Sequence, residues 1–143
     1  MTGDCAAPNP SYPKTAACAC GSLTMSVTSP PQAVHLCTCL DCQRASGSAF
    51  SYTAFFPQAA TAIAGSYRQR RRIASSGRWN DSHFCPDCGT GVFTVMEAMP
   101  GIVGIAVGCF ADPDFEKPAT LYWTMRRHHW LVPPPGVAVV ETQ

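Results

Sequence analysis

The sequence predicts one mainly β domain with little helix and short antiparallel sheets. Three observations lead to this fold class. Apolar and β-branched residues recur with a period of two, helical segments are scarce, and cysteines cluster at spacings typical of metal sites that supplement a modest core. With 143 residues, 46% of them hydrophobic and 13% charged, the chain has the size of a single domain.

A strand is expected in the segment "SLTMSVT", where Leu23, Met25 and Val27 alternate with small polar residues. A short helix is expected from Asp41 to Ser46, and Gly47 suits its C-cap. The arginine-rich run 68–72 is expected to form an exposed strand or loop rather than a binding patch. Aromatic and β-branched content predicts further strands in residues 49–56, 83–85, 91–96, 101–108 and 119–125.

The two ends of the chain differ from its middle. Residues 1–14 hold three prolines and residues 133–143 begin with a proline run, so both are expected to be tails around a domain at 15–132. The N-terminus lacks the charge and the apolar segment of a signal peptide, and no run approaches the roughly 20 apolar residues that span a bilayer. We therefore expect a cytoplasmic protein. A net charge of +1 gives no general attraction to nucleic acid or membrane.

The most specific motif is the sequence "CPDCG", in which Cys85 and Cys88 precede Gly89. Such a knuckle directs two thiolates at one metal ion, and glycine permits the left-handed backbone after the second ligand. Because cysteines in a reducing compartment stay free or bind metal, a structural zinc is expected here. A CxxC redox motif is the disfavoured alternative, since nothing around it resembles a thioredoxin-type pattern.

A structural zinc needs four ligands, and Cys18 and Cys20 are the best candidates for the second pair. Three cysteines then remain in "CTCLDC", namely Cys37, Cys39 and Cys42. Three thiolates on one zinc leave a coordination position for water or substrate, as in a catalytic site. Spacing alone leaves alternatives open, because Cys37 and Cys39 can serve the knuckle instead. His35, Asp41 or Cys109 can also complete the trio, or the trio can lack metal altogether.

The order of motifs resembles the glutathione-dependent formaldehyde-activating (GFA), or centromere protein V-like, family. The resemblance covers about residues 17–130. It rests on CxCG, on "CTCLDCQRASG" with its basic residue and glycine, on a Phe pair, on "FCPDCG", and on an Arg followed by a Trp in "RRHHW".

The resemblance implies a β-tent zinc-binding fold with two zinc ions. Cys18, Cys20, Cys85 and Cys88 are expected to hold the structural zinc, and Cys37, Cys39 and Cys42 a second, more labile one. It also implies carbon–sulfur lyase chemistry, the condensation of formaldehyde with glutathione to S-hydroxymethylglutathione. A small-molecule thiol and an electrophile are thus the expected partners, with glutathione as co-substrate.

The chemistry of a three-thiolate zinc agrees with that activity. A coordinated thiol is deprotonated near neutral pH, which supplies the thiolate that adds to an aldehyde. Three bound thiolates give the zinc site a formal charge of minus one, so its Lewis acidity is low. We therefore expect the zinc to bind a thiol rather than to generate hydroxide.

Glutathione carries two carboxylates, which suit arginine forks. Arg44 lies just after the trio and is the first candidate for this contact, followed by Arg126 and Arg127. His128 and His129 are candidate acids or bases, although we expect both to be exposed or core-rim histidines without that role. The aromatic residues are expected mainly in the core, and neither Cys5 nor Cys109 receives a role.

Two other functions remain open at this point. A GFA-like zinc enzyme can act on a larger electrophile in specialised metabolism, with the same thiol chemistry. Alternatively, the protein is a non-catalytic, zinc-stabilised binding module whose trio is structural. An open coordination position beside the trio favours chemistry, whereas a fourth protein ligand favours the module.

Overall fold

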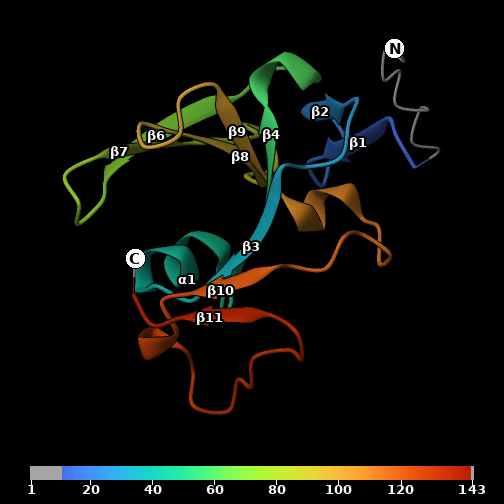
Figure 1. Ribbon diagram of the computed structural model, residues 1–143. Helices are drawn as coiled ribbons and strands as arrows, with labels where there is room; N and C mark the ends of the chain where they lie inside the picture. Colours follow the sequence, from blue (N-terminus) through green and yellow to red (C-terminus); the bar gives the residue numbers. More distant parts are fainter. Residues whose placement is uncertain (1–10, 143) are drawn as a thin grey trace, which may run out of the picture.

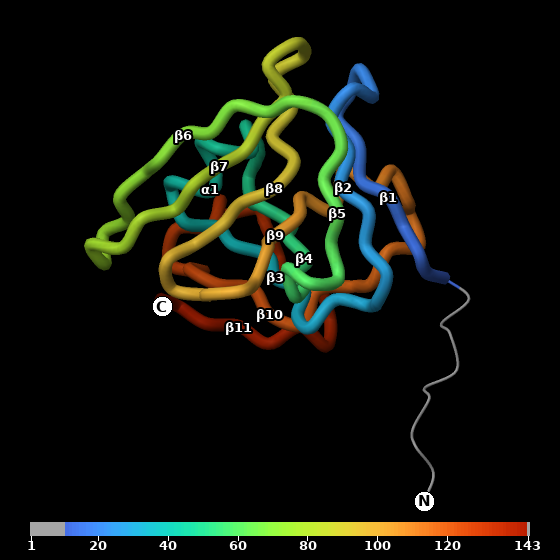
Figure 2. Tube along the Cα trace, turned by 90° about the horizontal axis from the view of Figure 1, so that it is seen from above, coloured from blue at the N-terminus to red at the C-terminus, as the bar shows by residue number. Residues whose placement is uncertain are grey.

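The computed structural model describes residues 11–142, which form two sheets and one short α-helix (Figure 1). Cys5 lies outside the described residues. The smaller sheet is antiparallel, with the order β1-β2-β5, and Figure 2 shows its three strands side by side. These strands are β1 (Lys14–Ala17), β2 (Thr24–Val27) and β5 (Thr61–Ala64).

The larger sheet has eight strands in the order β11-β10-β3-β4-β9-β8-β7-β6. They are β3 (Ala33–Cys37), β4 (Ser51–Pro57), β6 (Arg68–Ile73), β7 (Trp79–Phe84), β8 (Gly91–Met96), β9 (Ile102–Ala106), β10 (Thr120–Tyr122) and β11 (Ala138–Val140). Short 3-10 helices connect some of them: η1 (Gln58–Ala60), η2 (Val107–Phe110) and η3 (Thr124–Arg126).

This architecture confirms a mainly β fold with little helix. Neighbouring strands are antiparallel except for β10, which is parallel to both β3 and β11. These parallel pairs differ from the antiparallel sheets that the sequence predicted. Strand β11 lies in the segment 133–143 that was expected to be a tail, and its pairing with β10 extends the sheet beyond residue 132. Within the described residues, no helix is long and apolar enough to cross a membrane.

The core fills the space between the two sheets. In β2, Met25 and Val27 are buried while Thr24 and Ser26 are only half-buried, the alternation expected of a strand with one covered face. Their partners on the large sheet include Val34, Phe56 and Ile105. A smaller cluster of Leu36, Leu121 and Val137 anchors β10 and the segment before β11 against β3.

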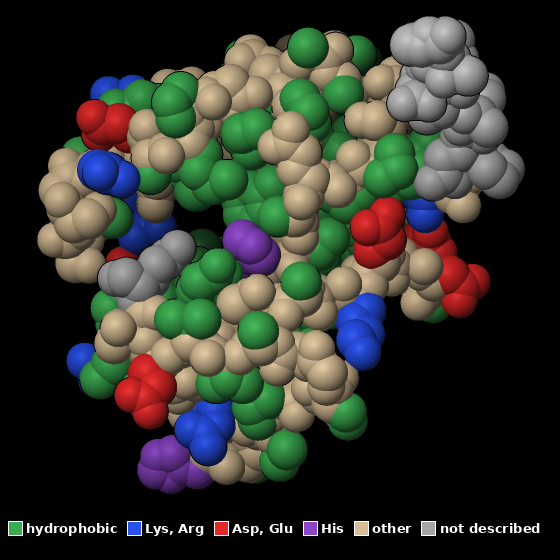
Figure 3. All heavy atoms as spheres, viewed as in Figure 1, with side chains coloured by type: hydrophobic (Ala, Val, Ile, Leu, Met, Phe, Trp, Pro, Cys, Tyr) green, Lys and Arg blue, Asp and Glu red, His purple; other side chains and the backbone are tan. Residues whose placement is uncertain are grey.

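The other face of the large sheet is hollowed rather than covered by a second sheet. Register places on this side the odd-numbered residues of β3 and β4, the even-numbered residues of β6, β7 and β9, and Thr94 and Met96 of β8, which lie beyond the register shift near Phe84. We call this side the hollow face. Figure 1 shows β3 descending between the upper strands and the lower part of the molecule, where α1 (Leu40–Ser46) lies. Figure 3 shows a hollow between these two parts, with Lys or Arg and His side chains at its walls.

Candidate metal centres

Two turns bring Cys18, Cys20, Cys85 and Cys88 together. Gly21 and Gly89 follow the second cysteine of each turn with φ of 82° and 79°, the left-handed conformation that glycine adopts without strain. In each turn the glycine N–H donates to the carbonyl of the first cysteine, at 3.0 Å in one and 2.9 Å in the other. The sequence therefore folds each cysteine pair locally, and the tertiary structure joins the pairs.

The four ligand sulfurs lie within 4.8 Å of one another, and the eight described cysteines form no disulfide. The Sγ of Cys20 is 3.6 Å from that of Cys18 and 3.7 Å from that of Cys85. Thiolates around a tetrahedral zinc, with bonds of about 2.3 Å, lie about 3.8 Å apart. The separations thus suit a tetrahedral metal ion.

Backbone N–H groups donate to the sulfurs of Cys18 and Cys85 in this four-cysteine group, which we call the closed cluster. Metal-bound thiolates accept hydrogen bonds of the same kind. Leu23 donates its N–H to the Sγ of Cys18 at 3.2 Å, and Asp87 donates to the Sγ of Cys85 at 3.4 Å. The Thr90 hydroxyl contacts the Sγ of Cys88 at 3.2 Å, and its hydrogen bond lowers the pKa of Cys88 to about 5. Donors of this kind favour the anionic form that a metal requires.

The second cluster lies where β3 meets α1. Cys37 ends β3, Cys39 is the N-cap of α1, and Cys42 lies in the first turn of the helix, with the ligand sulfurs within 4.8 Å of one another. The Cys39 Sγ accepts the N–H of Cys42 at 3.3 Å, which caps the helix. Within residues 11–142, the group contains no fourth Cys, His, Asp or Glu ligand, so this trio is an incomplete coordination shell.

The trio also favours a thiolate. Hydrogen bonds from the thiols of Cys37 and Cys42 lower the pKa of Cys39 to about 2, while the same bonding and burial raise the pKa of Cys37. A negative charge is therefore stabilised at the centre of the cluster. Such a donor set can hold a metal ion that prefers soft thiolate ligands.

Thr38 fixes the backbone of the trio, a role that the sequence analysis missed. Its side chain is fully buried, and its hydroxyl lies 2.7 Å from the carbonyl of Trp123 and 3.0 Å from that of Tyr122. Gln43 adds a second tie, because its Nε2 donates to the Thr38 carbonyl at 2.8 Å and to the Arg126 carbonyl at 3.0 Å. The end of β10 thereby determines where the three cysteines lie.

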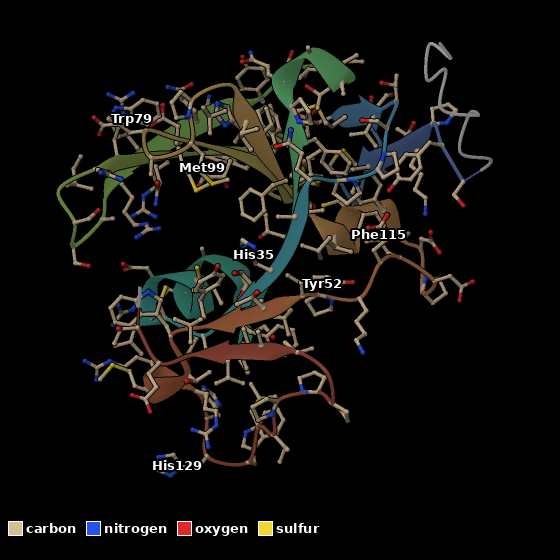
Figure 4. The ribbon with its side chains drawn as sticks, in the orientation of Figure 1. His35, Tyr52, Trp79, Met99, Phe115 and His129 are labelled. Carbon is tan, nitrogen blue, oxygen red and sulfur yellow. The ribbon has the colours of Figure 1, made fainter. Side chains whose placement is uncertain are left out.

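His35 shares the hollow face with Cys37, two residues before it on β3. Figure 4 shows His35 beside the space between the upper strands and α1. Its ring packs 5.0 Å from that of Phe55 and 4.8 Å from that of Tyr122, and burial lowers its pKa, so it is neutral near pH 7. His35 is not among the ligands of the trio.

Asp41 is also not a ligand of the trio. Its carboxylate pairs with Arg72 of β6, at 2.7 Å between Oδ2 and Nη1, so this ion pair bridges the hollow from the upper strands to the helix. The Arg72 side chain is 28% exposed. The run 68–72 is therefore a largely exposed strand, as predicted, but one of its arginines reaches the candidate site.

Arg44, the first candidate for the thiol carboxylate, lies on another side of α1. It lines a groove of about 520 Å³ together with Gln43, Phe50, His128 and Trp130. Phe50 packs with the cluster of Leu36 and Leu121, which belongs to the face of the sheet opposite Cys37. Arg44 and the trio thus face different spaces.

The remaining candidates lie around that groove or apart from both centres. Arg126 has an exposed side chain, and Arg127 donates its Nε to the carbonyl of Leu131 at 3.2 Å. His128 contacts the Gln43 amide at 3.0 Å, and His129 is exposed. Cys109, which received no role from the sequence, lies in η2, where its thiol donates to the Gly91 carbonyl at 3.5 Å.

The fold and the two cysteine clusters define a small β-sheet protein with one complete and one incomplete thiol centre. A family model described as "Glutathione-dependent formaldehyde-activating enzyme" matches residues 13–126. Because this match spans most of the chain, the protein belongs to that family, as the sequence motifs indicated.

A solved structure supports the fold assignment. The crystal structure of a Rhodobacter sphaeroides protein aligns with a TM-score of 0.56 over 73% of this chain and 96% of that chain, at 17% sequence identity. This likeness concerns the fold alone. No curated protein sequence matches the chain.

Proposed function

We propose that the protein is a zinc-dependent carbon–sulfur lyase-type enzyme that acts on a glutathione adduct, such as S-hydroxymethylglutathione. The observation that carries this proposal is the incomplete shell of Cys37, Cys39 and Cys42 on the hollow face, next to the Asp41–Arg72 ion pair. A structural zinc would be enclosed by four protein ligands, as the other cluster allows. Membership of the family supports glutathione and formaldehyde as the reactants.

The closed cluster would hold the structural zinc and the trio the second one. Zinc bound by the trio would keep the incoming thiol in its thiolate form at neutral pH. In the forward reaction the glutathione sulfur forms a bond to the formaldehyde carbon, the C=O π bond breaks, and the resulting alkoxide takes up the proton that the thiol released. The reverse reaction breaks the same C–S bond.

The residues of the chain would orient the reactants. The Thr38 and Gln43 hydrogen bonds hold the trio in place against β10, and the Phe55 and Tyr122 rings shield one side of the hollow around His35. The neutral imidazole of His35 can hydrogen-bond a polar group of the substrate without adding positive charge to the site. Arg44, which faces the separate groove, is a less suitable partner for the carboxylates than the sequence suggested.

The test uses two variants of Cys39. Cys39→Ala removes both a ligand and the helix cap, whereas Cys39→Ser removes the thiolate but keeps an effective N-cap residue. With ¹³C-labelled formaldehyde and glutathione, exchange NMR measures the rate at which free and adduct forms interconvert. The wild type should accelerate this exchange in proportion to its concentration, and both variants should lose the acceleration while keeping the zinc of the closed cluster.

Equal exchange rates with the wild type, with Cys39→Ser and without protein would refute the proposed activity. Loss of activity in Cys39→Ala alone would assign Cys39 a capping role and remove its thiolate from the mechanism. Zinc content and far-UV circular dichroism of each variant establish that the fold is retained in the comparison.

A further inference from the structure

The inner side of β6 carries three arginines that face the hollow. Arg68, Arg70 and Arg72 pair with Phe84, Ser82 and Asn80 of β7, and alternate residues of a strand point to the same face. Arg72 reaches across the hollow to Asp41 of α1 at 2.7 Å. Arg70, two residues earlier, therefore faces the same space, and Figure 3 shows Lys or Arg atoms within this hollow.

The four arginines of β6 differ in how they are paired. Arg71, on the opposite face, forms a two-pronged pair with the buried Asp81 at 2.8 and 3.0 Å and stacks over Trp79 at 4.4 Å. Arg72 is paired with Asp41. For Arg68 and Arg70, by contrast, no ion pair exists within residues 11–142, so two like charges lie next to each other on one face.

Two adjacent guanidinium groups that have no acidic partner in the described part of the chain suit a ligand with two carboxylates. Residues i and i+2 of a strand lie about 6.8 Å apart, and an extended tripeptide such as glutathione spans roughly 10 Å. Asp41, which Arg72 contacts, lies in the sequence between Cys39 and Cys42 of the trio. A thiol bound at the trio can thus extend along β6 and bring its carboxylates toward these arginines.

We propose that Arg70 and Arg68 bind the carboxylates of the thiol substrate and select a thiol that carries two carboxylates, such as glutathione. This inference rests on the proposed function and names the specificity residues of that site. Arg72, already paired with Asp41, connects β6 to the helix and positions the row. Charged side chains also protect an edge strand from aggregation, but that role predicts no effect on thiol binding.

The experiment measures the binding of two thiols by calorimetry to the zinc-loaded protein. Glutathione has two carboxylates and 2-mercaptoethanol has none. Arg70→Gln should weaken glutathione binding about tenfold, because one charge-assisted bond to a carboxylate is lost. The double variant Arg68→Gln/Arg70→Gln should weaken it further, because it loses two such bonds. The affinity for 2-mercaptoethanol should change less than about twofold.

Two matched controls remove the same charge elsewhere. Arg78→Gln changes an exposed arginine in the turn between β6 and β7, and Arg44→Gln changes the residue in the separate groove. Both should leave glutathione affinity within about twofold of the wild type. Thermal midpoints and zinc content verify that each variant is folded.

The outcomes separate this inference from the proposed function. If glutathione binds the wild type and loses affinity in Cys39→Ser, but the double arginine variant binds it as tightly as the wild type, the inference alone is wrong. Equal loss of both thiols in the arginine variants also overturns it, since that pattern reflects a damaged site. If glutathione binding is absent or independent of Cys39, both the inference and the proposed function fail.

Discussion

Replacing Thr38 with Val tests whether the end of β10 holds the cysteine trio in place. The hydroxyl of Thr38 contacts the carbonyls of Tyr122 and Trp123, and the side chain is fully buried. Valine has nearly the same shape but cannot donate a hydrogen bond. The substitution therefore removes the hydroxyl's hydrogen bond to the end of β10, and leaves the backbone bond of residue 38, without opening a cavity.

The expected cost follows from the contacts that remain. The Tyr122 carbonyl keeps the backbone N–H of Thr38 at 3.0 Å, and the Trp123 carbonyl keeps that of Arg126 at 2.9 Å, so neither oxygen becomes unsatisfied. The loss is then one net hydrogen bond, about 1 kcal/mol. A methyl group in place of the hydroxyl, close to two oxygens, adds about 1 kcal/mol of overpacking.

We therefore expect Thr38→Val to lower the free energy of unfolding by about 2 kcal/mol. Urea denaturation followed by tryptophan fluorescence measures this change, and Thr38→Ser, which keeps the donor, should restore most of it. The trio should also release zinc to a chelator faster in Thr38→Val, while the closed cluster is unaffected. Unchanged stability together with unchanged zinc release would refute the reasoning.

Three further predictions concern the two centres and the core. A chelator should remove zinc in two phases, the trio first, because the closed cluster has four protein ligands; a single phase would contradict the distinction. Gly65→Ala should destabilise the fold by about 3 kcal/mol or more, because the added Cβ would lie 1.9 Å from the Ser22 carbonyl oxygen and because φ at this position is +96°. A thermal midpoint equal to that of the wild type would disprove this close approach. Burial lowers the pKa of His83 below its usual value near 6.5, so the unfolded chain binds more protons and stability should fall as pH drops from 7 toward 5. His83→Phe, which keeps the stacking on Phe93, should reduce that fall in urea denaturation, and an identical pH profile would exclude His83 as its source.

Local patterns were sufficient to predict much of the fold and the grouping of the cysteines. The alternation around Met25 and the cap at Gly47 reflect short-range chemistry, and the structure has a strand and a helix there. The CxCG and CPxCG turns each place their own two sulfurs, and the structure brings Cys18 and Cys20 together with Cys85 and Cys88. Such features depend on neighbouring residues and are visible in a sequence.

Features set by distant contacts were not predictable. The run 68–72 contains no hydrophobic alternation, so the sequence alone cannot tell which arginines face the hollow; only pairing with β7 decides this. The role of Thr38 depends on a parallel strand more than 80 residues later, since its hydroxyl bonds at a sequence separation of 84 and 85. Arg44 adjoins the trio in sequence and lines a groove with Phe50 and His128, a neighbourhood that depends on distant segments and so was not visible in the sequence.

The most direct test of a thiol-binding metal site is a titration of glutathione into protein whose two cysteine clusters have been loaded with cobalt(II). The visible absorption spectrum of cobalt(II) depends on the ligands that coordinate it. A thiolate that joins Cys37, Cys39 and Cys42 should change that spectrum and saturate at about one glutathione per chain. Cys39→Ser should show no such change. An unaltered wild-type spectrum at saturating glutathione would contradict an open, thiol-binding metal site.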